Sequence, residues 1–385
     1  MLEMALFFFV GLAAGIASGL FPGLHPNLIS SIALVQNIEY EKKAVLIVSV
    51  YAGHIIFSAV PAVFFGIPDE STIVSVLPGN RMALDGNGIA AIKTMAVSTL
   101  FASVLALLFM PFALWFYPQA YGAASPYLIY ILVLASLLLV ARTKKPLLSA
   151  AVFLAAGLLG FYALRMEMQD GFLPLFSGFF AMGAILNYRK QKMPRQKDGN
   201  LDLGILKYSA LGMALGGLAN LIPAISSPAQ IAAFASIFIA FETENYLATV
   251  AAVNAGQFVF ALASSASMDK ARHGLVINLA QIIGIGENLN MLLFYFLLGI
   301  AIAGAALFLL RKKAGQLSGV DFSWFNWILA LYLLFVVFTL DGVLGVLVFA
   351  ISSALGYATV RIGVERTVMM AAIIVPTILL LVGIS

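Results

Sequence analysis

The segment Gly11–Asn27, GLAAGIASGLFPGLHPN, interrupts an apolar helix with two prolines and therefore constrains the fold most strongly. Pro22 and Pro26 lack a backbone N–H, and Gly23 tolerates backbone angles that other residues avoid. Lipid cannot form hydrogen bonds with the backbone N–H and C=O groups that a helix break leaves unpaired. Such a break is therefore found only where it is buried in protein or lines a water-filled cavity. The break is therefore a candidate binding site. The alternative is a simple proline kink, in which neighbouring helices satisfy the freed carbonyl groups.

A similar break recurs in the second half of the chain, where the sequence reads PAISSPAQ. The first matched block lies at an offset of 201 positions and the following block at an offset of 203. Broken helices at corresponding places in two halves point to a transporter's binding site. We infer an internal duplication with repeats at 1–188 and 202–385, joined by a basic linker at 189–201. The matched residues are Gly11/Gly212, Ala13/Ala214, Gly15/Gly216, Leu20/Leu221, Pro22/Pro223, Glu39/Glu242, Glu41/Glu244, Val50/Val253, Ala52/Ala255, Gly53/Gly256 and Phe57/Phe260.

The composition is that of an integral membrane protein. Hydrophobic residues make up 62% of the chain, charged residues 10%, and the mean hydropathy is +1.04. Apolar runs of about 17 to 25 residues, enough to cross a bilayer as helix, recur along the whole length. The start of the chain lacks a basic segment and a cleavage site, so no removable signal peptide is predicted. We expect a multi-pass protein of the cell membrane without disulfides or cysteine-based metal sites, because cysteine is absent.

The distribution of basic residues discriminates between two topologies. The linker is rich in lysine and arginine and is predicted to be cytoplasmic. If each broken segment enters and returns on one side, each half has five crossings and the halves are inverted. The basic residues at 311–313, Arg361 and Arg366 then also lie inside, whereas six crossings per half would put them outside. The sequence thus predicts an all-α fold of two inverted repeats, with about ten spanning helices, re-entrant broken helices at the prolines and external termini. Lys270 and Arg272 would be external exceptions.

Each break leads into a new helix, and a helix N-terminus offers free N–H groups and partial positive charge to an anion. We therefore expect an anionic substrate at the two breaks, with unwound carbonyl groups holding a coupling cation. The expected substrate contacts are Pro22, Gly23, His25, Asn27, Tyr51, His54, Arg81, Pro223, Ser226, Ser227, Asn254 and Gln257, and the expected cation contacts are the carbonyls of Leu20, Phe21, Leu221 and Ile222.

Several of these residues have a second interpretation. The polar side chains on the helices after the breaks can equally join helices by hydrogen bonds. His25 can carry a coupling proton or cap the break. Arg81 can reach the anion or pair with Asp85 at helical spacing, within a polar stretch at 68–88 that is predicted to be a loop with turns at 78–80 and 85–88.

Other classes of function lack their motifs. The sequence contains neither a P-loop nor HExxH, and its three histidines are scattered. No basic face with interleaved aromatic residues suggests nucleic acid. The chain is therefore not expected to be an enzyme, to bind nucleic acid or to need a cofactor other than a coupling Na⁺ or H⁺.

The first hundred residues resemble the large membrane subunit of tripartite tricarboxylate transporters, in its shorter archaeal-type form. The resemblance rests on the first break, on YAGHIIFSAVP after it, on ALDG at 83–86 and on the second proline break, within a looser match at 204–290. It implies a secondary transporter of small organic anions that works with a small membrane subunit and an extracytoplasmic binding protein. The chain departs from the family pattern in reading PGLHPN for PGLGAT, in the apolar Phe64, Phe65 and Val74, and in Ala224 for glycine.

The sequence therefore predicts a cation- or proton-coupled symporter for an organic anion such as a carboxylate, in contact with membrane lipid and compatible with a homodimer. One alternative keeps the architecture and changes the substrate to a lipid-linked phosphate of the polyprenyl type. Another is a membrane scaffold or an intramembrane enzyme.

Overall fold

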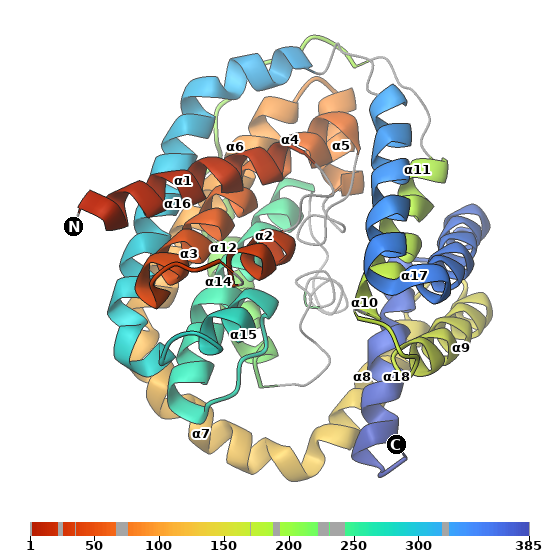
Figure 1. Cartoon of the computed structure of the whole chain (residues 1–385). Helices are drawn as coiled ribbons and strands as arrows, with labels where there is room; N and C mark the ends of the chain where they lie inside the picture. The colour runs from red at the N-terminus through yellow and green to blue at the C-terminus, as the bar shows by residue number, and fades with distance from the viewer. Residues whose placement is uncertain are drawn as a thin grey trace. The chain divides into compact units, whose positions relative to one another are not determined.

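The computed structural model describes residues 2–21, 26–34, 36–66, 76–169, 171–187, 193–221, 231, 243–317 and 323–384. Every regular element in these ranges is a helix, and eight of the described helices are long and apolar enough to cross a membrane. The prediction of an all-α integral membrane protein is thereby confirmed. The chain forms two compact units, the first built from Met1–Ser125, Lys192–Ala232 and Ala240–Val320, and the second from Pro126–Gln191, Ala233–Ile239 and Asp321–Ser385 (Figure 1).

The first unit contains the helices on both sides of the two proline breaks. Helix α3 and helix α4 form one bent span, interrupted at Ser58, because Pro61 has no N–H to offer the Phe57 carbonyl group. The described helices of this unit are α1 (Leu2–Leu20), α2 (Pro26–Leu34), α3 (Tyr40–Phe57), α4 (Ala59–Phe65), α5 (Val76–Leu84), α6 (Gly88–Leu108), α7 (Met110–Ala124), α12 (Ile205–Ala219), α14 (Thr243–Met268), α15 (Gly274–Ala280) and α16 (Ile285–Leu317).

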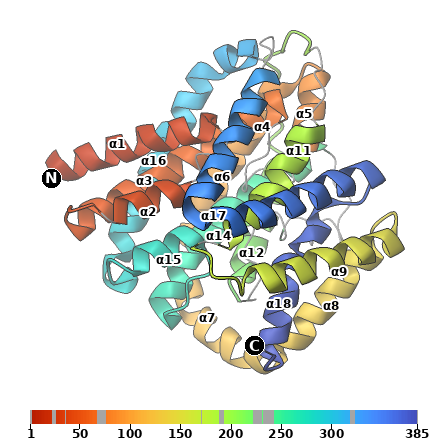
Figure 2. The same cartoon turned by 45° about the vertical axis from the view of Figure 1, so that its right-hand side comes forward.

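Helices α1 and α3 lie side by side and parallel (Figures 1 and 2). Gly11 lies on the carbonyl group of Leu46, and a methyl group added at Gly15 would come 2.1 Å from the Val50 oxygen. Small residues of this kind let helix backbones approach closely in membrane proteins. Gly15 and Val50 each come four residues after Gly11 and Leu46, so the two helices run in the same direction and start at the same end.

Helix α2 returns toward that same end. The Lys43 ammonium, near the start of α3, donates a hydrogen bond of 2.9 Å to the Leu34 carbonyl oxygen at the end of α2. At the same end Lys42 forms an ion pair with Glu3 near the start of α1. The start of α1 and the end of α2 therefore both lie beside the start of α3.

Helices α12 and α14 repeat the α1–α3 packing in the same register. A methyl group at Gly212 would lie 2.3 Å from the Thr249 oxygen, and one at Gly216 would lie 2.5 Å from the Val253 oxygen. Thr249 and Val253 stand 203 positions after Leu46 and Val50, and the two glycines stand 201 positions after Gly11 and Gly15. The offsets found in the sequence thus recur as equivalent close contacts.

The remaining long helices of this unit each pack against a helix from the other half of the sequence. Helix α3 packs against α16 from the second half, and α14 packs against α6 from the first. Helices α6 and α16 also contact each other, and Ile89 at the start of α6 lies beside Gly315 near the end of α16. This reciprocal pattern is expected of two related halves around a pseudo-two-fold axis.

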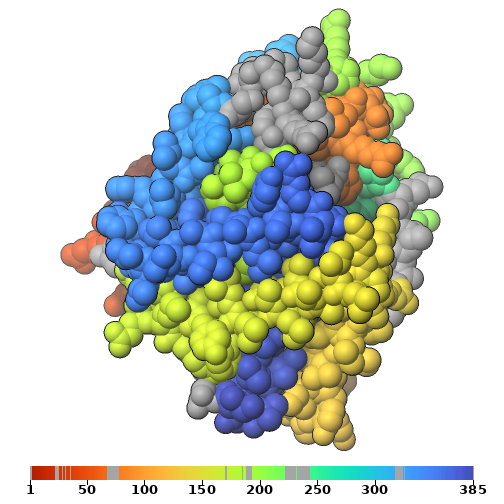
Figure 3. Space-filling model, turned by 90° about the vertical axis from the view of Figure 1, so that its right-hand side faces the viewer, coloured from red at the N-terminus to blue at the C-terminus, as the bar shows by residue number. Residues whose placement is uncertain are grey.

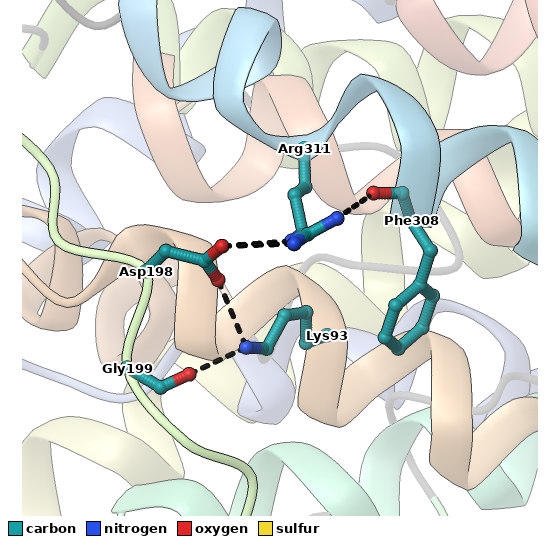
Figure 4. A network of polar contacts seen from close by, with 5 residues as sticks. All are labelled: Lys93, Asp198, Gly199, Phe308 and Arg311. Atoms are coloured by element: carbon teal, nitrogen blue, oxygen red, sulfur yellow. Dashed lines mark hydrogen bonds and ion pairs between the residues drawn. The ribbon is translucent and has the colours of Figure 1, made fainter.

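The basic linker is attached to the first unit by an ionic network (Figure 4). The Asp198 carboxylate accepts hydrogen bonds of 3.0 Å from Lys93 Nζ on α6 and from Arg311 Nε on α16. Lys93 also donates to the Gly199 carbonyl group, and Arg311 donates to that of Phe308. The hydrogen bond from Lys93, assisted by the charges of Lys93 and Arg311, holds the pKa of Asp198 below its ordinary value despite partial desolvation.

The second unit is a separate set of closely packed helices. A methyl group at Gly160 would lie 2.1 Å from the Ala372 oxygen, and one at Gly356 would lie 2.3 Å from the Phe179 oxygen. Gly342 has φ 62° and ψ −152°, angles that only glycine adopts readily, and divides α17 at a sharp bend. Figure 3 shows one face of this unit, where α17, α9 and α18 are visible. Its helices are α8 (Leu128–Ala141), α9 (Pro146–Ala163), α10 (Phe172–Phe176), η2 (Ser177–Met182), α11 (Gly183–Asn187), α17 (Ser323–Ile362), η3 (Arg366–Met370) and α18 (Ala371–Leu381).

One local prediction is wrong. The expected turn at 78–80 is part of helix α5, while the turn at 85–87 is present. Pro78 lies in the first turn of α5, where its missing N–H would have no helical partner. Gly79 lies against Val63, with no room for a larger residue: an added methyl group would come 2.9 Å from the Val63 side chain.

Candidate functional site

Buried polar side chains gather where α1 and α12 end, just before the two breaks. We call this set the polar layer, and all of its members belong to the first unit. Buried polar groups in a membrane protein require partners, and they often line a substrate path. The polar layer comprises the buried Ser18, Tyr51, His54, Asn220, Asn254 and Gln257 and the half-buried His273.

On the first-half side, His54 faces Ser18. His54 is 1% exposed, and its Nδ1 lies 3.0 Å from Ser18 Oγ. The Ser18 hydroxyl donates to the Gly15 carbonyl oxygen at 2.9 Å, so Nδ1 of His54 carries the proton and donates to Ser18. The imidazole is thus oriented by α1 with Nε2 as the acceptor nitrogen.

The equivalent position on the second-half side is Gln257, which is fully buried. Its backbone carbonyl group accepts a 3.2 Å hydrogen bond from Asn220 Nδ2, and Gly216 accepts another of 3.1 Å. The Asn220 carboxamide oxygen is buried and accepts no hydrogen bond from any residue that the structure describes. Asn220 therefore keeps an acceptor available beside the second break.

Tyr51 lies between the two halves. Its hydroxyl donates to the Asn254 carbonyl oxygen at 3.4 Å, and Nε2 of His273 lies 3.2 Å from the same hydroxyl. Asn254 is 203 positions after Tyr51, so residues at equivalent positions of the two predicted repeats touch here. The rings of Phe258 and Phe296 lie against Tyr51, with centroids 4.5 and 6.1 Å away, and exclude water from one side.

Asn27, at the start of α2, is held close to this centre by α15. The Asn27 carboxamide lies against Gly274, where an added methyl group would come 2.9 Å from Asn27 Nδ2. One turn later, Asn278 Nδ2 donates a 2.6 Å hydrogen bond to Ser30 Oγ. Because His273 directly precedes Gly274, the start of α2 and the Tyr51 hydroxyl are joined through one short segment of the second half.

The structure brings together Asn27, Tyr51 and Asn254 through His273, and it places His54 and Gln257 at matching positions of the polar layer. Arg81 is exposed on α5 and forms no ion pair with Asp85 or any other described residue. Leu20, Phe21 and Leu221 lie at the helix ends before the breaks. The predicted site residues outside the described part of the chain are Pro22, Gly23, His25, Ile222, Pro223, Ser226 and Ser227.

The sequence did not point to four polar residues at this site. Ser18 and Asn220 sit among small apolar residues, and only the packing of α1 on α3 and of α12 on α14 shows their role. His273 and Asn278 follow Lys270 and Arg272, which were expected to be external. The sequence feature that could have indicated His273 is its position directly before Gly274, the first residue of helix α15. Among the described residues, no three His, Asp or Glu side chains form a metal-binding group.

Comparison with known proteins identifies the class. The family model described as the tripartite tricarboxylate transporter TctA family matches residues 5–371, and the chain belongs to this family. The protein is therefore a multi-pass membrane permease and not an enzyme, and its family is that of the large subunit of a tripartite transporter. Such a subunit implies a small membrane subunit and a binding protein as partners.

One relative of the chain comes from an archaeon. "Uncharacterized protein MJ1079" of Methanocaldococcus jannaschii is 24% identical over 267 residues, which cover 67% of each chain. No solved structure matches the chain significantly.

Proposed function

We propose that this permease carries a small organic anion by alternating access between two inverted repeats, with the polar layer as its substrate site. One observation carries the proposal: both broken helix pairs have the same close-packed register and end in the same layer of polar groups, where Tyr51 meets its repeat equivalent, Asn254. A site shared by two related halves can be exposed to either side by rocking one half against the other.

The contacts of α1, α2 and α3 support a re-entrant first segment. The start of α1 and the end of α2 both lie at the start of α3, through Glu3–Lys42 and Leu34–Lys43. A segment that leaves and returns on one side adds no crossing, which supports five crossings in each half.

The contact between Arg311 and Asp198 supports the same topology. It joins the basic end of α16 to the linker at 3.0 Å, so both lie on one side of the membrane. Six crossings in each half would separate them. An odd number of crossings in each half makes the halves inverted, and the positive charge then gathers on the cytoplasmic side.

A coupling ion completes the proposal. The last carbonyl groups before each break, at Leu20, Phe21 and Leu221, can offer oxygens to a sodium ion, and the layer's histidines can carry a proton. Membership of a carboxylate transporter family argues for a soluble anion and against a lipid-linked phosphate.

The test removes one hydroxyl from the polar layer. We expect Tyr51→Phe to lower the uptake of labelled carboxylates into proteoliposomes about tenfold or more, because a hydrogen bond to a charged ligand is worth about 1.5 to 3 kcal/mol. Lactate, succinate and citrate serve as probes, under sodium and proton gradients. Tyr295→Phe is the matched control, since its hydroxyl forms no hydrogen bond with a described residue.

A second variant, Asn27→Ala, probes the start of α2. Both variants should retain the thermal unfolding temperature of the parent within a few degrees, which separates lost binding from lost folding. Unchanged uptake in both would remove the basis for placing the substrate in the polar layer.

A further inference from the structure

A cavity lies between the basic linker and the helices α6 and α16, and we call it the linker cavity. Its volume is about 470 Å³, which is within the range of small-molecule binding sites. The linker contributes Met193, Arg195 and Asp198 to its walls, α6 contributes Ile89, and α16 contributes Lys312. All of these residues belong to the first unit. Apolar and basic side chains thus line one cavity.

The linker side of this cavity has a defined position because Gln196 is hydrogen-bonded to the segment that enters α6. Gln196 Oε1 accepts a hydrogen bond of 2.8 Å from the Gly88 backbone N–H. Its Nε2 donates to the Ala83 carbonyl oxygen at 2.9 Å. Arg195, the preceding residue, therefore stands on backbone that is held against the start of α6.

Two cations of the linker cavity have no counter-ion among the described residues. Asp198 is the carboxylate among the lining residues that the structure describes, and it accepts hydrogen bonds of 3.0 Å from Lys93 and from Arg311 (Figure 4). Its charge is thereby compensated. Arg195 and Lys312 are exposed, and neither forms an ion pair or a hydrogen bond with a side chain in the described part of the chain. The linker cavity therefore attracts anions.

The linker cavity lies where an apolar helix surface ends. Helix α16 is long and apolar enough to cross a membrane, and Leu309 and Leu310 are exposed near its end. Lys312 follows them within one helical turn. Basic residues at such a boundary attract anionic phospholipids, and basic pockets between membrane helices bind phospholipid headgroups.

We propose that the linker cavity binds the phosphate group of an anionic ligand, which is a phospholipid headgroup or a soluble phosphate. The planar guanidinium of Arg195 matches the geometry of phosphate oxygens, and the Lys312 ammonium adds a second charge. Ile89 and Met193 supply apolar surface to the same cavity, which suits the glycerol and first methylene groups of a lipid. The site lies outside the polar layer and does not depend on the proposed function.

The test measures thermal unfolding of the purified chain in detergent with three probes. The probes are phosphatidylglycerol, phosphatidylcholine with the same acyl chains, and inorganic pyrophosphate. A bound ligand at about a hundredfold excess over its apparent Kd should raise the unfolding temperature by about 3 °C. Phosphatidylcholine should not, because its choline group offsets the phosphate charge. Stabilisation by phosphatidylglycerol alone identifies a lipid headgroup as the ligand, and stabilisation by pyrophosphate identifies the phosphate group itself as sufficient.

The variant Arg195→Gln combined with Lys312→Gln removes the two cations. Without ligand it should unfold within a few degrees of the parent, because both side chains are exposed. Its apparent affinity for the stabilising probe should be at least tenfold lower, since charge-assisted hydrogen bonds are lost. Lys144→Gln combined with Lys207→Gln is the matched control. It removes the same charge from exposed positions that do not line the cavity, and it should keep the parent affinity within twofold.

Three results would overturn the proposal. They are equal stabilisation by phosphatidylcholine and phosphatidylglycerol, no stabilisation by any probe, and an affinity of the double variant that equals that of the parent or of the control. If the double variant does not fold, Lys312→Gln alone gives the second measurement. A loss of affinity of about threefold or more in this single variant supports the site, and an unchanged affinity contradicts it.

Discussion

Asp198 is the residue through which the linker between the halves holds two helices of the first unit. Lys93 on α6 and Arg311 on α16 both donate to its carboxylate (Figure 4). The Asp198 side chain is 24% exposed and that of Lys93 11%, so the pair is screened less than one at an open surface. The ionised form of Asp198 therefore stabilises the folded first unit.

This network predicts a pH dependence with a definite sign. Because the folded pKa of Asp198 lies below the ordinary value, its contribution is present above about pH 4 and declines as the pH falls through the folded pKa. We expect Asp198→Asn to lower the free energy of unfolding by about 1 to 2 kcal/mol at neutral pH. The difference from the parent should shrink in acid, measured by thermal unfolding in detergent between neutral pH and pH of about 3.

Asp202→Asn is the control for this pH series. Asp202 is exposed and accepts a hydrogen bond of 2.8 Å from the Gly204 backbone N–H, without an ion pair to a described residue. Its substitution should produce a smaller difference. A difference for Asp198→Asn that stays constant down to the lowest pH would contradict the assignment of the effect to this carboxylate.

Individual site residues were only partly predictable from the sequence. Tyr51 and Asn254 could be paired because they occupy equivalent positions of the predicted duplication, and such positions are expected to meet at a pseudo-two-fold axis. His273 could not be identified in this way, because its partner Tyr51 is 222 residues away and no local spacing connects them. Ser18 was missed because the register of α1 on α3, which aims it at His54, comes from glycine packing and not from polar spacing.

At the scale of helices, the glycines of α1 and α12 set the distance between paired backbones. Gly15→Ala and Gly216→Ala would each push a methyl group against a carbonyl oxygen, at 2.1 and 2.5 Å. We expect each substitution to destabilise the protein by about 1 to 3 kcal/mol through overpacking. Thermal unfolding of the purified chain measures the change.

The substitution Gly304→Ala is expected to have the opposite effect on the stability of the protein. Gly304 lies within α16, and nothing lies within 4 Å of a methyl group added there. Alanine is favoured over glycine within a helix by up to about 1 kcal/mol, so this variant should be as stable as the parent or more so. Equal effects at Gly15 and Gly304 would show that helix propensity, and not close packing, governs these positions.

The helices themselves were largely predictable from apolar run length and proline position. The exception, α5, shows why local signals fail: proline and glycine at 78 and 79 indicate a turn, but tertiary packing on Val63 makes a helix there. Propensity is a weak preference that tertiary contacts override. The same limit applies to the bend of α17 at Gly342. The apolar residues around Gly342 give no local signal for the unusual backbone angles that it adopts.

For the whole molecule, the decisive question is whether each half crosses the membrane five times or six. Within the first unit, the start of α3 lies with the start of α1, while the linker lies with the end of α16. If the linker is cytoplasmic, the α2–α3 turn and the segment around Lys270 are external. The absence of cysteine makes this topology directly measurable, because every introduced cysteine is then the sole reactive thiol.

We expect Asn37→Cys and Lys270→Cys to react with a membrane-impermeant maleimide in intact cells. Lys197→Cys and Lys312→Cys should react only in inside-out vesicles. All four positions are exposed, so accessibility depends on the side of the membrane and not on burial. Six crossings in each half would move position 312 to the side opposite position 197. Labelling of positions 197 and 312 from opposite sides of the membrane would therefore exclude inverted repeats. Labelling of both from the same side is the result expected when the two halves have opposite orientations in the membrane.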